Sequence, residues 1–237
     1  MKLDFSNGSW KTDKVVYANS YRWAQVPAFL EEDDALVNYQ SEDASTGYEN
    51  ISLMLREPIA GDMRITLRTS FESWGAPLIV LAEDLERDKD GLWRYREYYE
   101  VVLYEEGVNV WRLTTDAENT VSWRKVMSVD FPVSCHDIHT LTVDVVADTL
   151  LIDADGRRMS VMLPAPFAAY YVGFDACENI NRFYSFDVEP IQKNAADYIC
   201  SVCGYAHVGD TPPERCPDCG VGPEKFTPSK ENEYVCN

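Results

Sequence analysis

The sequence has no long hydrophobic run, few basic residues and few histidines. No apolar segment approaches the ~20 residues that span a bilayer, and residues 1–8 hold no apolar segment of signal-peptide length. We therefore expect a cytoplasmic chain without a membrane partner. Only 21 Lys and Arg residues stand against 40 Asp and Glu residues, which gives a formal charge of −19. A field of that sign repels phosphate and argues against nucleic acid as a partner.

Cysteine is scarce outside one short segment. An odd count of seven in a chain without a secretion signal argues against a disulfide framework. Cys135 and Cys177 lie in strand-like segments, where we expect small buried apolar side chains, and Cys236 is expected to be a free thiol. The other four cysteines form two Cys-x-x-Cys pairs.

From residue 1 to 190 the dominant pattern is alternation of apolar and polar residues, which is typical of half-buried strands. Turn signals such as Lys89-Asp90-Gly91 separate the alternating stretches. The expected strands are 35–40, 50–56, 63–71, 77–83, 93–103, 108–114, 121–129, 139–145, 149–154, 159–163, 169–175 and 182–188. About a dozen short strands without a long amphipathic helix predict a mainly β fold, a two-sheet sandwich or jelly roll.

The alternation ends at Pro190, which cannot continue a central strand. We interpret 191–197 as a linker, 198–229 as a second small domain and 230–237 as a tail. Residues 195–237 contain five of the seven Cys, five of the 12 Pro and four of the 12 Gly residues. A segment this small cannot sustain a hydrophobic core, so another interaction must stabilise it.

Two Cys-x-x-Cys-Gly turns predict a metal site formed by Cys200, Cys203, Cys216 and Cys219. Each turn places two sulfurs on one side, and the following Gly allows a positive φ that directs amide N–H groups toward the thiolates. Two such turns supply four ligands in a tetrahedron. This geometry suits either zinc or iron, since soft thiolates accept both ions.

Around these cysteines the chain resembles the rubredoxin domain that ends rubrerythrins. The likeness covers residues 198–226, and the 12 residues between the Cys pairs match the short form of that domain. Tyr198, Tyr205 and Phe226 match the aromatic residues that pack beneath the metal. The resemblance implies one iron ion bound by four sulfurs, one-electron transfer and a redox partner protein.

The chain departs from rubrerythrins elsewhere. Those proteins carry a helical di-iron bundle with Glu-x-x-His motifs, whereas the three histidines here, at positions 136, 139 and 207, do not follow a Glu by three residues. The peroxidase activity of that family is therefore not expected.

The larger domain resembles concanavalin A-like and laminin G-like jelly rolls. The strand pair in residues 139–156, with its Leu-x-Val-x-Val pattern and its Asp-Gly turn, carries the likeness together with 171–174 and 183–188. The resemblance implies a fold shared by sugar-binding modules and glycan-active enzymes, and it makes a carbohydrate a candidate ligand.

Catalytic motifs are weak in this domain, and we expect no catalytic residue. The acidic stretch 83–91 lacks strand alternation and is interpreted as a solvated loop, and the segment 135–139 is interpreted as ordinary strand residues in which His136 and His139 face opposite sides. Outward-facing polar residues could line a ligand groove: Arg64, Arg68, Arg94, Arg96, Tyr98 and Glu100.

Three function classes remain. The first is an iron-containing electron-transfer protein with the sandwich as a docking or ligand-binding scaffold. The second is a glycan- or protein-binding module in which a metal, iron or zinc, only stabilises the C-terminal segment. The third, a glycan-active enzyme, ranks last because no paired-carboxylate motif is present.

Overall fold

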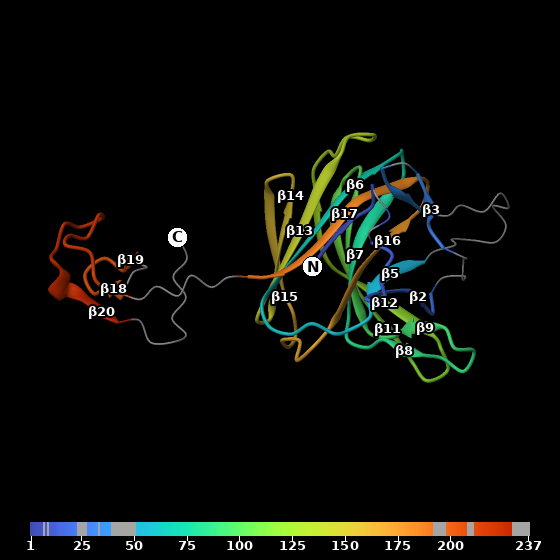
Figure 1. Cartoon of the computed structure of the whole chain (residues 1–237), viewed down its shortest axis with the longest axis horizontal. Coiled ribbons are helices and arrows are strands. Elements are labelled where there is room, and N and C mark those ends of the chain that lie inside the picture. Colours follow the sequence, from blue (N-terminus) through green and yellow to red (C-terminus); the bar gives the residue numbers. More distant parts are fainter. Residues whose placement is uncertain are drawn as a thin grey trace. The chain divides into compact units, whose positions relative to one another are not determined.

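The computed structural model describes residues 1–6, 8, 10–22, 28–32, 34–38, 51–191, 198–207 and 211–228. The chain divides into two compact units, Met1–Ile191 and Gln192–Asn237 (Figure 1). Of the predicted linker, 191–197, the structure describes only Ile191. The predicted tail, 230–237, lies outside the described residues. Among the described residues, no helix has the length and apolar character needed to cross a bilayer.

The first unit is a sandwich of two sheets, which confirms the predicted fold. Sheet A has the order β15-β14-β13-β6-β17-β4-β3, with β1 also paired to β17. Its strands are β1 (Lys2–Asp4), β3 (Leu30–Glu31), β4 (Leu36–Val37), β6 (Met63–Phe71), β13 (His139–Val146), β14 (Thr149–Ala154), β15 (Arg157–Met162) and β17 (Asn181–Pro190).

Sheet B has nine strands in the order β12-β11-β10-β7-β16-β5-β2-β9-β8, and all its pairs are antiparallel except β2 with β9. The strands are β2 (Val15–Ser20), β5 (Ser52–Leu55), β7 (Ala76–Ala82), β8 (Glu86–Arg87), β9 (Trp93–Tyr95), β10 (Tyr98–Tyr104), β11 (Gly107–Thr115), β12 (Val121–Asp130) and β16 (Tyr171–Cys177).

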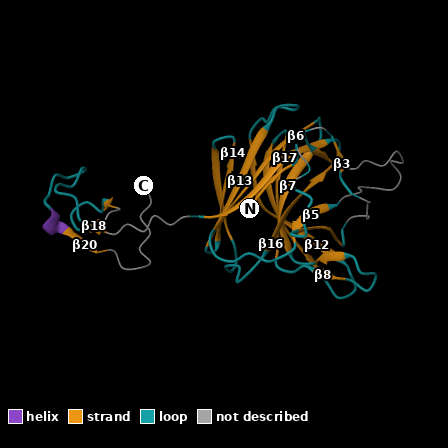
Figure 2. Cartoon of the chain, viewed as in Figure 1, coloured by secondary structure: helices purple, strands orange, loops and turns teal. Residues whose placement is uncertain are grey.

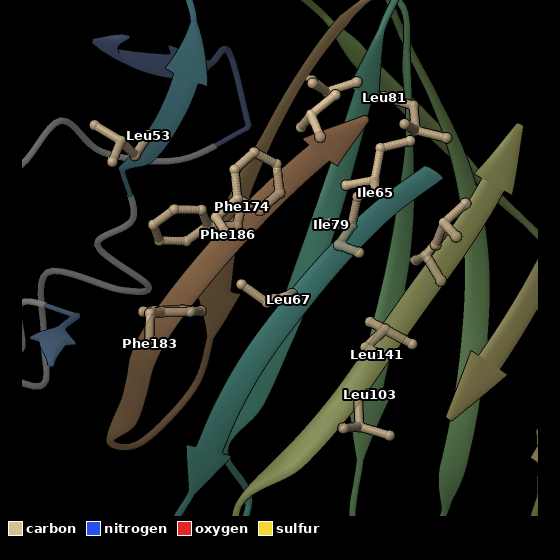
Figure 3. Packing of buried hydrophobic residues seen from close by; sticks show 14 of the residues in the cluster. Leu53, Ile65, Leu67, Ile79, Leu81, Leu103, Leu141, Phe174, Phe183 and Phe186 are labelled. Atoms are coloured by element: carbon tan, nitrogen blue, oxygen red, sulfur yellow. The ribbon is translucent and has the colours of Figure 1, made fainter. Parts of the chain in front are cut away.

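The main hydrophobic core lies between the two sheets. Ile65 and Leu67 of β6 face Ile79 and Leu81 of β7, and all four side chains are fully buried (Figure 3). Phe174 of β16 joins a group of aromatic rings at one side of this core. The alternation in the sequence thus directs one apolar face of each sheet inward, and burial of those faces stabilises the sandwich.

The outer face of sheet B is also largely covered. All seven residues of β7 are buried, and a second hydrophobic cluster includes Leu78, Val80, Leu85 and Tyr95. The β8–β9 segment supplies Leu85 and Tyr95 to this cluster. A strand buried on both faces reads as a continuous apolar run, as residues 76–82 do.

The structure corrects several expected elements. Residues 93–103 form two strands, β9 and β10, which occupy different places in sheet B. Strands β1, β2, β3 and β8 were not predicted. β1, β3 and β8 have two or three residues, too few to show alternation, and the sequence of β2 does not alternate cleanly between apolar and polar residues. Pro190 is the last residue of β17, where it ends the pairing with β6.

In the described part of the second unit, residues 198–207 and 211–228, there are a small sheet of order β19-β18-β20 and a 3₁₀ turn (Figure 2). Its elements are β18 (Tyr198–Cys200), β19 (Ala206–His207), the turn Pro223–Lys225 and β20 (Phe226–Pro228). Its buried cluster consists of Cys200, Cys216 and Phe226. With so little apolar burial among its described residues, the cysteines form the centre of this unit.

Candidate metal centre

Two matching turns position the four cysteines of the second unit. The amide of Gly204 donates to the carbonyl of Cys200 at 2.9 Å, and the amide of Gly220 donates to the carbonyl of Cys216 at 2.8 Å. Both glycines have positive φ, 80° and 75°. A side chain is strained in this conformation, which explains the Gly that follows each Cys-x-x-Cys.

The sulfur atoms of the two turns converge. The four Sγ atoms all lie within 4.8 Å of one another. Those of Cys200 and Cys219 are 3.7 Å apart, and those of Cys203 and Cys216 are 3.5 Å apart. A tetrahedron with metal–sulfur bonds of ~2.3 Å has edges of about 3.8 Å. The arrangement therefore fits one tetrahedrally coordinated metal ion.

The site has a buried side and an exposed side. Cys200 and Cys216 are buried, whereas Cys203 and Cys219 are exposed. Tyr198, Tyr205 and Val221 pack with Phe226 against the buried sulfurs. This packing places one edge of the cluster at the surface of the domain.

The four thiols also influence one another electrostatically. Desolvation raises the pKa of the Cys200 thiol, but hydrogen bonds from the amides of Cys203 and Val202 outweigh it and lower the pKa to about 7. The backbone amide of Tyr205 lowers the pKa of the Cys203 thiol. Desolvation and the neighbouring sulfurs outweigh it and raise the pKa of that thiol to about 12. Four adjacent sulfurs cannot all become thiolates without a cation, so binding of a metal ion must release protons.

Comparison with known proteins agrees with this geometry. Residues 198–227 match the family model described as "Rubrerythrin, rubredoxin-like domain". This segment is a rubredoxin-like domain. A curated relative, Reverse rubrerythrin-1 of Clostridium acetobutylicum, is 50% identical over 32 residues, which cover 14% of this chain. The match spans only 18% of that protein's length, so the likeness concerns the rubredoxin-like domain alone.

The sandwich is similar in fold to proteins of solved structure. The carbohydrate recognition domain of Emp46p, in its metal-free form, aligns with a TM-score of 0.56 and 12% identity, covering 80% of this chain and 95% of that one. A Bacillus licheniformis beta-glucanase aligns with a TM-score of 0.53 and 7% identity, covering 81% and 98%. At such identities the likeness establishes the jelly-roll fold.

The structure separates the six residues proposed to line a groove. Arg64 and Arg68 lie on β6 of sheet A, whereas Arg94, Tyr98 and Glu100 lie on sheet B. Arg96 binds the carbonyl of Asp116 and the side chain of Asn119 near the β11–β12 turn. Tyr98 and Glu100 are buried, because the outer face of sheet B is covered at β10.

The remaining candidates mostly have structural roles. Within the acidic stretch 83–91, Asp84 accepts hydrogen bonds from the amides of Arg96 and Glu97, and Glu86–Arg87 form the short strand β8. Cys135 lies in the loop before β13, not on a strand, and is half-buried. Of the segment 135–139, only His139 lies on a strand, as the first residue of β13. Its ring nitrogens contact Asp155 and the carbonyl of Ser134, which gives it a structural role.

One group of residues was missed by the sequence reasoning, apart from Glu100, which it named as a candidate groove residue. On the outer face of sheet B, Lys125 of β12, Trp111 of β11 and Glu100 of β10 are direct cross-strand neighbours, and Trp123 lies beside Leu113 in the adjacent row. The alternation of residues 121–125 indicated a strand but not which residues it would meet on the neighbouring strands.

Arg22 completes this group from another part of the chain. Its Nη1 lies 3.4 Å from Oε2 of Glu100, and its guanidinium carbon lies 5.5 Å from the centre of the Trp123 ring. The Trp123 side chain is nevertheless 58% exposed. We call Arg22, Glu100, Trp111, Trp123 and Lys125 the sheet B platform.

Proposed function

We propose that the rubredoxin-like domain binds one iron ion and transfers single electrons to or from a partner protein in the cytoplasm. The convergence of four sulfurs within 4.8 Å carries this proposal. Iron bound by four thiolates supplies a one-electron couple, and zinc in the same site would be purely structural. Reducing conditions in the cytoplasm would keep the four thiols available to the metal.

The arrangement of the chain around the cysteines supports an electron-transfer role. Cys203 and Cys219 are exposed, and Val202 beside them is 58% exposed, so the cluster has an edge that a partner can approach. A formal charge of −19 favours a partner with a positive docking face. Their association should slow as ionic strength rises.

The metal in the native protein tests this proposal. The protein is purified anaerobically from its source without overexpression, and metal content and visible absorption are measured. One iron per chain with thiolate-to-iron absorption supports electron transfer. One zinc per chain without visible absorption would contradict it and would leave the metal a structural role.

We further infer that the sandwich binds a carbohydrate on the sheet B platform. The exposed Trp123 offers an apolar ring on which a sugar ring can stack, and the polar groups of Arg22 and Lys125 beside it can bond hydroxyls. The sandwich shares its fold with a carbohydrate recognition domain and a beta-glucanase, which supports a carbohydrate ligand.

A matched pair of tryptophan variants tests carbohydrate binding. Native gels containing soluble polysaccharides should retard the wild-type protein. Trp123→Ala should lose the retardation, whereas Trp74→Ala, which removes a 71% exposed ring from the β6–β7 turn, should retain it. Equal behaviour of the two variants would contradict the assignment of the platform.

A further inference from the structure

A hollow of about 290 Å³ lies at one edge of the sandwich. It is bordered by β12, the last strand of sheet B on that side, and by β15, the last strand of sheet A, which lies against β12. Three side chains give the hollow apolar walls: Val126 of β12, and Val161 and Met162 of β15. Met162 is 75% exposed, so this apolar lining is open to solvent.

A row of three side chains on the inner face of sheet B leads into the hollow. Tyr99 of β10 is paired with Arg112 of β11, and Arg112 is paired with Arg124 of β12. The guanidinium carbon of Arg112 lies 5.8 Å from the centre of the Tyr99 ring, and both Tyr99 and Arg124 line the hollow. Burial raises the pKa of Tyr99, and the charges of Arg112 and Arg124 act in the opposite direction. Two cations therefore act on one hydroxyl group at this edge.

Only one of these two arginines has a carboxylate to balance it. Like charges directly opposite each other on neighbouring strands repel. Nη2 of Arg112 lies 3.6 Å from Oε2 of Glu97. Desolvation raises the pKa of Glu83, and Arg112 opposes that effect, so a second glutamate also acts on Arg112. Within the part of the chain that the structure describes, Arg124 forms no ion pair, and its side chain is exposed one strand closer to the edge.

We propose that this hollow binds a small organic carboxylate with an apolar body, such as a short alkyl or aryl acid. The guanidinium of Arg124 presents a fork of donors that matches a carboxylate. The apolar body of the ligand lies against Val126, Val161 and Met162, which removes apolar surface from water on both sides. Ligand pockets begin at about 300 Å³, so the hollow limits the ligand to a small molecule.

The hollow and the sheet B platform lie on opposite faces of β12. Successive side chains of a strand point to opposite faces. Lys125 lies 5.0 Å from the centre of the Trp111 ring on the outer face, whereas Arg124 is the neighbour of Arg112 on the inner face. The proposed carboxylate site is therefore independent of carbohydrate binding on the platform and of the metal centre.

The test is an NMR titration of the full-length, metal-loaded protein labelled with ¹³C at its methionine methyl groups. Met162 supplies a probe in the wall of the hollow, and Met162→Leu assigns its resonance. Hexanoate and phenylacetate should shift this resonance saturably. Their uncharged counterparts, hexanamide and phenylacetamide, should bind at least tenfold more weakly. Acetate, which has the charge without the apolar body, should also bind at least tenfold more weakly than hexanoate.

Arginine variants locate the charge that binds the ligand. Arg124→Gln should weaken hexanoate binding at least tenfold, and Arg124→Lys should weaken it by a smaller factor, because it keeps the charge but loses the fork. Arg158→Gln is the matched control, since it makes the same change on β15 at a side chain that is 87% exposed, and it should bind like wild type. Because both arginines are exposed, all three variants should keep the wild-type melting temperature within a few degrees.

Each outcome of the titration decides the proposal. Hexanoate that binds no more tightly than hexanamide, or equally well to Arg124→Gln, would overturn the carboxylate site. Acetate that binds as tightly as hexanoate would overturn the role of the apolar walls. A Met162 resonance that does not move with hexanoate or phenylacetate would show that the hollow is not a binding site for such acids.

Discussion

The guanidinium of Arg22 lies 3.4 Å from the buried carboxylate of Glu100, and these two residues come from segments separated by 78 positions. Glu100 is 3% exposed on a strand whose outer face is covered. Burial raises its pKa from the ordinary 4.5 to about 7, although Arg22 acts in the opposite direction. A carboxylate desolvated to this degree makes the stability of the sandwich depend on pH.

Stability should fall as pH rises from about 4.5 to 7. In this window folded Glu100 holds a proton that the unfolded chain has released, so raising the pH favours unfolding. Replacement by Gln removes the titration. The unfolding free energy of Glu100→Gln minus that of wild type should therefore increase by about 3 kcal/mol, in the direction of a more stable variant, between pH 4.5 and pH 8.

Urea denaturation at the two pH values measures this difference. Glu97→Gln is the matched control, because the Glu97 side chain is 48% exposed three residues earlier. A Glu100→Gln variant that behaves like this control would show that Glu100 is not desolvated.

Loss of one cysteine ligand should unfold the rubredoxin-like domain and spare the sandwich. A four-thiolate site contributes on the order of 10 kcal/mol to a small domain, and the buried cluster among the described residues of this domain consists of Cys200, Cys216 and Phe226. Cys203→Ser or Cys219→Ser should make residues 198–228 sensitive to protease. Residues 1–191 should remain resistant.

Cys135→Ser serves as the control for these variants. Cys135 is half-buried in the sandwich and distant in sequence from the cluster, so the substitution should leave metal content and protease resistance of the rubredoxin-like domain unchanged. A domain that stays resistant and metal-free in Cys203→Ser would refute a metal-stabilised fold.

The sandwich should fold without the metal domain. Its two sheets bury their own apolar faces around residues such as Ile65 and Ile79, and the division of the chain falls at Ile191. A chain ending at Ile191 should show β-type circular dichroism and a cooperative thermal transition. An aggregated or molten product would show that the sandwich depends on the segment removed.

The sequence predicted the long strands of the sandwich because their alternation is strong. Residues 63–71 and 139–145 were expected as strands and form β6 and most of β13. The alternation of 93–103 was misleading about exposure. Tyr98 and Glu100 occupy the positions of solvent-exposed residues in that pattern, but they are buried. Burial of the second face of a sheet depends on segments far along the chain, such as the one that carries Arg22.

The metal centre was more accessible to sequence reasoning than the platform. Its ligands follow from local turns, because Cys-x-x-Cys-Gly fixes the geometry of each half within five residues. The platform depends on the pairing of β10, β11 and β12 and on a bulge between Val110 and Trp111, neither of which is encoded locally.

The central claim is that the four cysteines hold an iron ion that transfers electrons. Voltammetry of the native protein, with its metal content determined on the same sample, tests it most directly. The account predicts one iron per chain and a reversible one-electron wave, lost in Cys219→Ser. One zinc per chain and no reversible wave would contradict it.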